Sequence, residues 1–226
     1  MKKRTVTFVT CCTPNAFEQM AKELAQSCKQ HGVRTLIRKL PMEGRGRNFY
    51  GHAMIQCLPD LDAALCDGPV ALVDADQLLV ADIPDSLWNG SWKVAAVNRR
   101  GKRDMVQIYG VAQNYLSSVV LFNNKDPEFA RMFMLEWTRL THKIGLKPSG
   151  HEMAKSRDEF YVARHWKPTW FCDQAALNKI LEKLKASSPG DVLDLSKDIW
   201  SARKPGGKAI MVHYKGVRGK GYDQKK

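Results

Sequence analysis

The sequence predicts an α/β protein with a mostly parallel central sheet flanked by helices. A β-rich segment at residues 5–10, a helix-period segment and a second β-rich segment at residues 33–37 follow one another along the chain. A near-continuous apolar run at residues 68–73 is typical of a strand buried on both faces. Because the chain has 226 residues and is 44% hydrophobic, we expect a single domain over residues 1–226.

The first part of the chain alternates between strand and helix signals. Thr and Val dominate residues 5–10 and predict a buried first strand. A helix is expected from Pro14 to Gly32, because apolar residues recur at helical spacing and glycine commonly ends a helix. Three more segments complete this part: a strand at 33–37, a Gly- and Arg-rich loop at 41–48, and a helix at 49–58.

After the apolar run at residues 68–73, apolar segments separated by polar loops continue the α/β pattern. The expected elements are a helical turn near Leu87, strands at 92–97 and 116–122, helices at 127–137 and 172–184, and a strand at 209–212 that leads to His213. Between them lie a basic loop at 98–104 and a polar, basic segment at about 141–170. The Gly- and Lys-rich tail at about 218–226 is expected to be flexible.

The charge of the chain is strongly positive. Lys and Arg number 36 against 23 Asp and Glu, which gives a net charge of +13. Residues 141–226 hold 18 basic and 9 acidic side chains, so most of the excess lies in the last 86 residues. Two interpretations stay open: a solvated surface, or a polyanionic partner such as nucleic acid, a nucleotide phosphate or an anionic membrane surface.

Cysteine usage and hydropathy indicate a cytoplasmic protein. The six cysteines include no CxxC pair, which favours reduced thiols and argues against a zinc site. The apolar stretch behind the basic start is too short for a secretory signal, and no apolar run approaches the ~20 residues of a membrane span. The sequence leaves the oligomeric state open.

The segment VALVDADQLLVADIP at residues 70–84 carries the clearest chemical signal. Asp74 and Asp76 directly follow the predicted central strand, at the sheet edge where α/β proteins bind ligands. Two neighbouring carboxylates repel each other, and a hard divalent cation such as Mg²⁺ or Mn²⁺ removes that repulsion and can hold a diphosphate. A pair of aspartates that only caps a turn is the alternative.

Four segments resemble GT-A glycosyltransferases, which have a Rossmann-like fold and use nucleotide-sugar donors. Residues 70–84 resemble the family segment "hhhhDxDhhhhxDh". LSSVVLFN at 116–123, CDQAALN at 172–178 and VHYKG at 212–216 are similar to the "NSGVMLFN", "DQxxLN" and "hHxxG" segments of the glycogenin-like family 8 enzymes. The resemblance runs from residue 5 to about residue 220.

The resemblance implies a metal site and a donor site. Asp74, Asp76 and His213 would hold Mn²⁺ or Mg²⁺, and the donor would be a UDP-sugar. The residues implied to contact the nucleotide sugar are Thr10, Cys11, Thr13, Asp74, Ala75, Ser118, Lys215, Gly216 and Lys220. The family's donor-binding Arg or Lys has no clear match before Asp74, and Arg45 and Arg47 are the nearest candidates for that contact. The family segment continues as "HxxGxxKPW". Here the lysine, Lys220, falls one place later than in that pattern and the Pro-Trp pair is missing. It therefore stays open which basic residue of 215–220 binds the diphosphate.

Asp173 and Gln174 are the residues that the resemblance implies at the reacting centre. Family 8 enzymes retain the anomeric configuration, and one of these two side chains would then stabilise the β-face of the sugar. An inverting enzyme instead needs a carboxylate base near the acceptor hydroxyl, and Asp173 would supply it. A helix start with a capping acid is the structural alternative for this pair.

The surplus charge suggests a second anionic partner, because a diphosphate needs only about two or three cations. The candidate acceptor-binding residues are Arg99, Arg100, Lys102, Arg103, Arg164 and Trp166. Aromatic side chains among cations suit bases and phosphates, so hydroxymethylated pyrimidine in DNA, as bacteriophage enzymes modify it, is the favoured acceptor. The alternative acceptors are a cell-surface glycan or lipid and a protein hydroxyl. The alternative functions of the protein are a nucleotidyltransferase and a non-enzymatic nucleic-acid-binding module.

Overall fold

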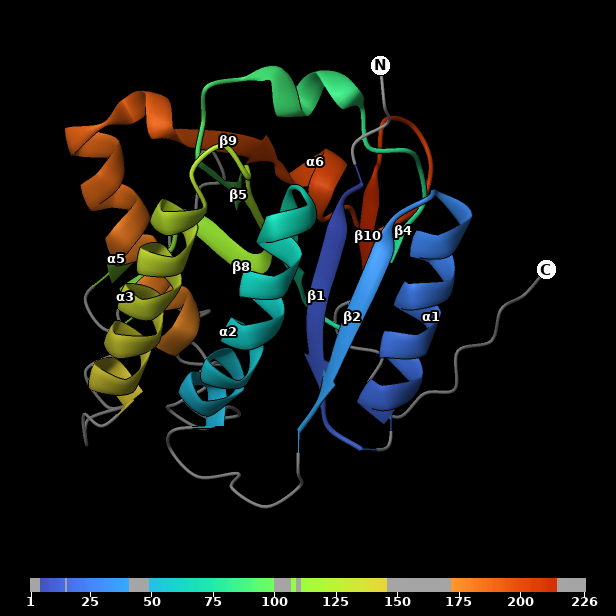
Figure 1. The fold of residues 1–226 in the computed structure, drawn as a ribbon, viewed down its shortest axis with the longest axis horizontal. Helices are drawn as coiled ribbons and strands as arrows, with labels where there is room; N and C mark the ends of the chain where they lie inside the picture. The colour runs from blue at the N-terminus through green and yellow to red at the C-terminus, as the bar shows by residue number, and fades with distance from the viewer. Residues whose placement is uncertain are drawn as a thin grey trace.

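The computed structural model describes residues 5–14, 16–40, 49–99, 107–108, 111–145 and 172–214. Its centre is a six-stranded sheet with the strand order β2-β1-β3-β8-β5-β9 (Figure 1). These strands are β1 (Thr7–Cys12), β2 (Arg34–Lys39), β3 (Val70–Val73), β5 (Val94–Asn98), β8 (Tyr115–Phe122) and β9 (Val192–Ser196). The predicted α/β class is confirmed.

Five of the six strands run in the same direction. β1 pairs in parallel with β2 and β3, and β5 pairs in parallel with β9. β8 alone runs antiparallel, between β3 and β5. The carboxyl ends of β1, β3 and β5 therefore lie at the same sheet edge as the start of β8. The prediction of a mostly parallel sheet is confirmed, and the reversed strand brings the 115–118 segment to the ligand-binding edge.

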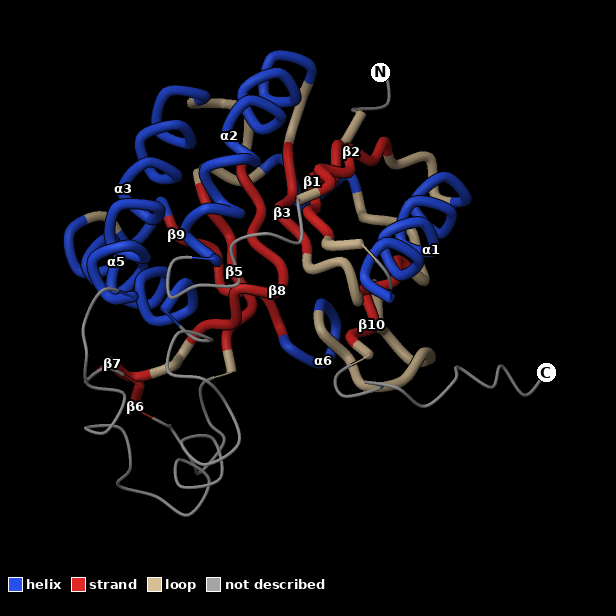
Figure 2. The backbone as a smooth tube through the Cα atoms, turned by 90° about the horizontal axis from the view of Figure 1, so that it is seen from below, coloured by secondary structure: helices blue, strands red, loops and turns tan. Residues whose placement is uncertain are grey.

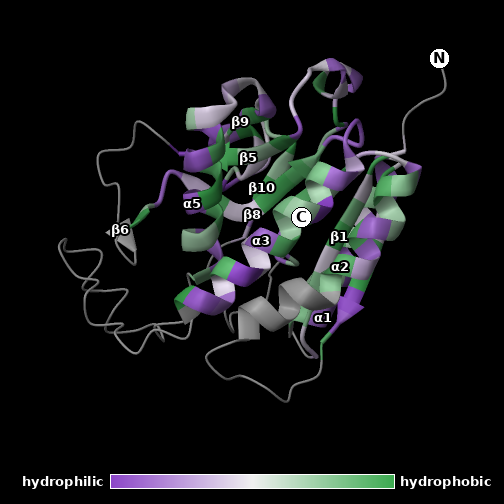
Figure 3. Cartoon of the chain, turned by 60° about the vertical axis from the view of Figure 1, so that its left-hand side comes forward, coloured by the Kyte–Doolittle hydropathy of each residue, from purple (hydrophilic) through white to green (hydrophobic). Residues whose placement is uncertain are grey.

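Helices cover one face of the sheet. They are α2 (Phe49–Asp67), α3 (Pro127–Gly145) and α5 (Cys172–Ser187), which lie together on one side of the strands in Figure 2. Leu61, Phe133 and Leu177 pack from these helices onto Val120 and Phe122 of β8. This half of the core is apolar because the strands carry aliphatic side chains on that face. Much of the central sheet is green, and so hydrophobic, in Figure 3.

The other face of the sheet is covered by smaller elements. They are α1 (Ala16–Gln30), β4 (Gln77–Leu79), β10 (Met211–His213), α6 (Lys197–Trp200) and the 3₁₀ helix η1 (Asp85–Asn89). Their apolar side chains, including Leu24, Trp88 and Met211, share one buried cluster with Ala71 and Leu121 of the sheet. β4 and β10 form a separate antiparallel ribbon with His213 opposite Gln77, so the distant His213 is carried to the turn after β3.

A close backbone approach fixes the start of β3. A Cβ atom on Gly68 would lie 2.4 Å from the carbonyl oxygen of Thr5, so only glycine fits there. The Thr7 N–H donates to the Pro69 carbonyl at 3.0 Å and continues this contact into the β1–β3 pair. The GP dipeptide thus lets β3 enter the sheet directly beside β1.

Several predicted bounds change in the structure. The helix expected to end at residue 58 continues to Asp67, because Leu61, Ala64 and Leu65 pack on the sheet and outweigh the hydrogen bond that Pro59 cannot form. The first strand extends to Cys12, and the helix expected to end at residue 184 reaches Ser187. Six short elements are not predicted from the sequence: β4, β9, α6, η4 (Pro189–Asp191), β6 (Gln107–Ile108) and β7 (Val111–Ala112).

Some predictions lie outside the described residues. They concern the loop at 41–48, most of the basic loop at 98–104, residues 146–170 of the basic segment, and the tail at 218–226. Over the part of the chain that is described, none of the helices combines the length and the apolar character that a bilayer crossing requires. The single-domain organisation stays a prediction.

Candidate functional site

The Asp-Ala-Asp segment forms a turn that is hydrogen-bonded to two neighbouring segments of the chain. Within the turn, the Gln77 N–H donates to the Asp74 carbonyl at 3.2 Å. The Asp74 N–H donates to the Ser118 carbonyl of β8 at 3.0 Å, and the Tyr214 N–H donates to the Asp76 carbonyl at 3.1 Å. The backbone of the turn is therefore held by β8 on one side and by the end of the β10 segment on the other.

The side chain of Ala75 packs the same turn against the core of the protein. This side chain is buried against Cys12 and Ala21, at the junction of β1 and α1. A larger side chain would displace the turn from that junction. Any contact of Ala75 with a nucleotide sugar therefore involves its backbone, while the carboxylates on either side of it remain at the surface.

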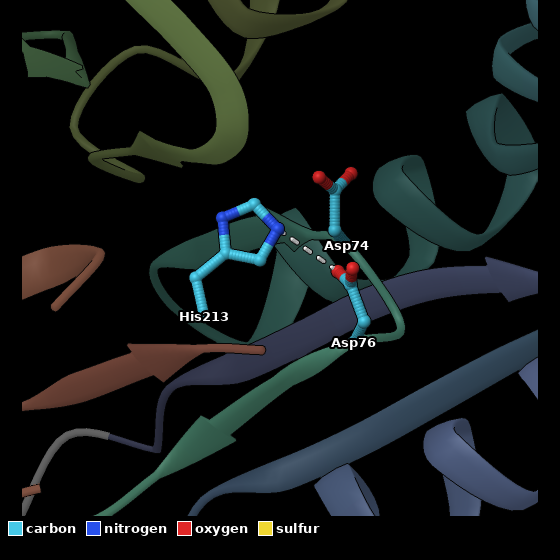
Figure 4. Close-up of side chains that lie close together, drawn as sticks. All are labelled: Asp74, Asp76 and His213. Carbon is cyan, nitrogen blue, oxygen red and sulfur yellow. Dashed lines mark ion pairs between the residues drawn. The ribbon is translucent and has the colours of Figure 1, made fainter. Parts of the chain in front are cut away.

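Asp74, Asp76 and His213 form one cluster of candidate metal ligands (Figure 4). One ligand atom from each lies within 4.8 Å of the others, and His213 Nε2 is 3.2 Å from Asp76 Oδ1. Asp74 is exposed, Asp76 is partly buried and His213 is buried. The sequence-predicted triad is thus brought together from a turn and a strand that are more than 130 residues apart.

These residues fit a divalent metal ion. Two carboxylate oxygens and an imidazole nitrogen are a donor set that Mn²⁺ accepts, and Mg²⁺ is compatible with the carboxylates. Ligands about 2.1 Å from an octahedral ion lie about 3 Å apart, which matches the spacing of His213 Nε2 and Asp76 Oδ1. An ion pair between a protonated His213 and Asp76 is the alternative arrangement, and metal-binding measurements separate the two.

Ser201 holds the other side of the His213 ring. Its Oγ lies 3.2 Å from His213 Nδ1, and Ser201 itself is only 3% exposed. A histidine that binds a metal through Nε2 must carry its proton on Nδ1, which can then donate to the serine oxygen. Ser201 is therefore placed to fix both the tautomer and the orientation of the ring.

Ser201→Ala should weaken Mn²⁺ binding by about 10- to 100-fold, because the imidazole loses the partner that orients it. Isothermal titration calorimetry with Mn²⁺ measures this change. Ser196→Ala is the matched control, because Ser196 lies five residues earlier and makes no capping hydrogen bond. An unchanged Mn²⁺ affinity in Ser201→Ala would show that Ser201 does not support a metal ligand.

A shift in the pairing register of β5 and β8 lies at Ser117 and Ser118, beside this cluster. One step along β5, from Ala96 to Val97, corresponds to four residues of β8, from Val120 to Leu116. Bulges redirect side chains near functional sites. Here the Ser118 carbonyl receives the Asp74 N–H, while the Ser117 hydroxyl bonds the carboxylate of Asp173 on α5. The Asp-Ala-Asp turn and the start of α5 thus converge on the same two residues of β8.

Asp173 is a partly buried carboxylate in the first turn of α5. Burial raises its pKa, although hydrogen bonds from Ser117 and from the Gln174 N–H partly oppose that rise. Its backbone carbonyl accepts a hydrogen bond from the Trp137 indole at 2.7 Å, which ties the helix start to α3. A raised pKa at a ligand-binding edge is typical of a functional acid, although structural contacts also produce such shifts.

Asp173→Asn should raise the stability of the protein at pH 7. Because the pKa of Asp173 is raised in the folded state, its ionised form is less favourable there than in the unfolded chain. The ionised Asp173 therefore lowers the free energy of unfolding at neutral pH. This effect disappears as the pH falls toward about 4, the ordinary pKa of the group, so the gain in Tm should shrink there. Thermal unfolding from pH 4 to pH 8 tests this. Asp85→Asn, at an exposed position, is the control, and a lower Tm of Asp173→Asn at pH 7 would contradict the expectation.

Gln174 belongs to a buried network of amides. Its Nε2 donates to Gln113 Oε1 at 3.0 Å. Asn178, one helical turn later, accepts from the Tyr115 N–H at 2.7 Å and donates to the Tyr115 carbonyl at 2.9 Å. The first two turns of α5 are thereby locked to the start of β8, and Asp173 and Gln174 share that rigid support.

The residues implied at the nucleotide lie at the end of β1. Thr10 is buried, and its Oγ1 has no hydrogen-bond partner among the described residues; Ser118 Oγ is in the same situation. Cys11 and Thr13 are partly buried. A hydrogen bond with Cys57, together with burial, raises the pKa of the Cys11 thiol, so this thiol stays protonated at neutral pH.

Of the candidate acceptor-binding residues, only Arg99 is described. It is partly buried, its Nε donates to the Gln113 carbonyl at 2.5 Å, and desolvation lowers its pKa. Arg99 therefore belongs to the edge of the amide network rather than to a freely exposed basic loop. The other residues implied at donor or acceptor lie outside the described ranges: Arg47, Arg100, Lys102, Arg103, Arg164, Trp166, Lys215, Gly216 and Lys220.

Sequence reasoning missed three residues that support the site: Gln113, Ser201 and Gln77. Gln113 precedes a strand, where polar residues usually indicate a loop, and Ser201 has no spacing relation to His213. Gln77 is fully buried, and neither polar atom of its amide has a partner among the described residues. Only the structure reveals that Gln77 lies opposite His213 in the β4–β10 pair.

The fold is shared with a glycosyltransferase of known structure. A crystal structure of a glycosyltransferase involved in the glycosylation of the major capsid of PBCV-1 superposes with a TM-score of 0.59 and 9% sequence identity. The match covers 95% of this chain and 96% of that one. No protein-family model matches the chain, and no curated protein matches its sequence. At this identity the similarity concerns the fold, and this chain therefore has a fold on which a glycosyltransferase is also built.

Proposed function

We propose that this protein is a metal-dependent glycosyltransferase. It moves a sugar from a nucleoside-diphosphate sugar, with UDP-sugar as the first candidate, to an acceptor hydroxyl. The observation that carries the proposal is the convergence on β8 of two groups: the Asp74, Asp76 and His213 cluster, and the Asp173 carboxylate bonded to Ser117. A purely structural pair of turn aspartates does not explain why a buried histidine from β10 is brought to them.

Asp74, Asp76 and His213 would hold the ion, with Mn²⁺ as the first candidate and Mg²⁺ as the second. When bound, the ion supplies positive charge against the negative charge that develops on the departing diphosphate. The chain's own part is to fix the ligands: the turn holds the two carboxylates, and Ser201 orients the imidazole. Lys215 or Lys220 would add a charge-assisted contact to the phosphates.

Glycosyl transfer breaks the bond between the anomeric carbon and the diphosphate oxygen, and the electron pair leaves with the diphosphate. The acceptor oxygen forms the new bond to that carbon, and its proton passes to a phosphate oxygen or to a base. The transition state resembles an oxocarbenium ion and carries positive charge on the sugar. We propose that Asp173 and Gln174 face this charge, which fits retention; if the reaction inverts, Asp173 is the base.

The acceptor that we propose is a polyanion, with hydroxymethylated pyrimidine in DNA as the first candidate. The described residues contain 18 basic and 17 acidic side chains, a balance of +1, whereas the whole chain carries +13. The surplus therefore falls almost entirely outside the described ranges, in segments that include Arg100, Arg164 and Trp166. A glycan, lipid or protein acceptor is the alternative, and the structural neighbour's involvement in capsid glycosylation supports it.

A donor-binding experiment tests the enzyme class. Thermal unfolding is followed with Mn²⁺ and each of a panel of nucleoside-diphosphate sugars, and binding should raise Tm only when metal and donor are both present. The nucleic-acid-binding module predicts a rise with DNA alone, independent of Mn²⁺. No shift with any donor would overturn the proposed function.

The acceptor is tested by transfer of a radiolabelled sugar. Hydroxymethylated DNA, unmodified DNA, oligosaccharides and a hydroxyl-bearing protein are supplied in parallel at the same Mn²⁺ concentration. Label on hydroxymethylated DNA alone supports the proposed acceptor. Label on oligosaccharide or protein alone would retain the glycosyltransferase and reject the DNA acceptor.

A further inference from the structure

Three buried amides in the network below Gln174 form a directed chain of hydrogen bonds. Gln113 Nε2 donates to the Val111 carbonyl at 2.8 Å. Its Oε1 accepts from Gln174 Nε2 at 3.0 Å and from Asn178 Nδ2 at 3.5 Å. Gln113 and Asn178 are fully buried, and Gln174 is 6% exposed. Because Gln113 and Asn178 are closed to water and Gln174 keeps only a small exposed fraction, hydrogen bonds between protein groups decide how the amides are oriented.

The orientation of Gln113 follows from the backbone. If its amide were reversed, Oε1 would face the Val111 carbonyl and two acceptors would oppose each other. The same reversal would set the NH₂ group of Gln113 against that of Gln174. The Val111 carbonyl belongs to β7, which pairs antiparallel with β6 (Figure 2), and it therefore determines the direction of the whole chain.

The orientation of Gln174 follows from that of Gln113. With Nε2 engaged by Gln113 Oε1, the atom of Gln174 that is left over is its carbonyl Oε1, to which none of the described residues donates a hydrogen bond. The two ends of an amide carry opposite partial charges. A carbonyl oxygen stabilises an oxocarbenium-like carbon, whereas an NH₂ group in the same place would destabilise it.

We propose that Gln113 is a positioning residue that fixes the Gln174 amide, so that Oε1 rather than the NH₂ group faces the anomeric carbon of the donor. This inference rests on the proposed function and deepens it. Gln113 touches neither donor nor acceptor and acts through Gln174 alone. Its contribution should therefore appear in kcat and not in the affinity for the donor or for Mn²⁺.

Two variants of Gln113 separate this role from a general effect on the fold. Gln113→Met keeps the length of the side chain and removes all three of its hydrogen bonds, and we expect kcat to fall about 10- to 100-fold with the KM for the donor unchanged. Gln113→Glu should recover much of this loss. A carboxyl group buried there stays protonated, so it donates to Val111 and still accepts from Gln174.

Asn114→Ala is the matched control. Asn114 neighbours Gln113 and also bonds α5, through Glu182 at 2.8 Å, whereas the Gln174 amide bonds Gln113. We expect its kcat to stay within about 2-fold of the unaltered protein. An equal loss of kcat in Asn114→Ala and Gln113→Met would overturn the proposal, because any loosening of α5 would then suffice.

A double variant tests whether Gln113 acts through Gln174. In the Gln174→Ala background, Gln113→Met should cause no further loss of kcat, because the group that it orients is already gone. An additional loss of about 10-fold in that background would overturn the proposal.

Side-chain amide exchange, followed by ¹⁵N NMR, provides a readout that does not depend on activity. The NH₂ protons of Gln174 should be protected in the unaltered protein and in Gln113→Glu, and should exchange rapidly in Gln113→Met. Unchanged protection in Gln113→Met would overturn the positioning role even in an active enzyme. Inactivity toward every donor would overturn the proposed function, while the exchange data would still decide whether Gln113 holds Gln174.

Discussion

Asp76→Asn should reduce sugar transfer by about 100- to 1000-fold, because the variant removes a charged ligand from the proposed metal site. Asp76 Oδ1 is the oxygen 3.2 Å from His213 Nε2, so the same ion would contact both residues. Asparagine keeps the shape of the side chain and can still offer a neutral oxygen. Raising the Mn²⁺ concentration should therefore restore part of the lost activity, and transfer rates measured across a Mn²⁺ titration test this.

The control for Asp76→Asn is Asp82→Asn. Asp82 lies six residues later, is exposed, and bonds His31 rather than His213. It should leave both the activity and the Mn²⁺-dependent rise in Tm unchanged. If Asp76→Asn transferred sugar at the normal rate, the cluster would not be the metal site. If it lowered Tm equally with and without Mn²⁺, Asp76 and His213 would form a structural ion pair instead.

The layered fold was predictable because its strongest signals are local. The apolar run before Asp74 could only be a strand buried on both faces, and β3 has that place between β1 and β8. Polar or short elements were not predictable in the same way. β9 buries only Val192 and Leu195 of its five residues and shows no regular alternation, and β4 has three residues that are stable only through pairing with β10. Such elements depend on tertiary contacts that no sequence window contains.

The candidate metal ligands were predictable from the sequence, but the residues that orient the functional side chains were not. Asp74, Asp76 and His213 carry recognisable motifs, and the structure brings their ligand atoms together. Gln113 and Ser201 act through single hydrogen bonds across 61 and 12 residues of sequence. A polar residue before a strand or after a short helix has the same appearance whether it faces water or a buried partner. The strand pairings of β8 with β5 and of β10 with β4, which only the structure gives, distinguish a polar residue with a buried partner from one that faces water.

Asn178, the last residue of the segment that resembles "DQxxLN", has a structural role. Asn178 is fully buried in α5, and it lies one helical turn after Gln174. Its Oδ1 accepts the Tyr115 N–H at 2.7 Å, and its Nδ2 donates to the carbonyls of Tyr115 and Gln174. An amide that both donates to and accepts from one strand residue imitates a neighbouring strand. β8 therefore continues its hydrogen bonding at the bulge-containing end, where the Ser117 and Ser118 segment departs from regular pairing.

Asn178→Ala should destabilise the protein by about 3 kcal/mol or more, since it removes two hydrogen bonds to the buried backbone of Tyr115 and opens a cavity. For a chain of this length, that corresponds to a fall in Tm of about 6–12 °C. Urea unfolding and calorimetry measure the change. Lys179→Ala, at the next and exposed position of α5, should stay within about 0.5 kcal/mol of the unaltered protein.

The size of the Asn178→Ala effect also distinguishes two views of the motif. If Asn178 serves the fold, stability falls while the Mn²⁺ affinity of the folded protein stays normal, because the metal cluster lies on the β3–β4 turn and β10. If Asn178 contacts the donor instead, the variant should keep its Tm and lose donor affinity. The two hydrogen bonds to Tyr115 lead us to expect the first result, and a Tm within about 2 °C of the unaltered protein would exclude it.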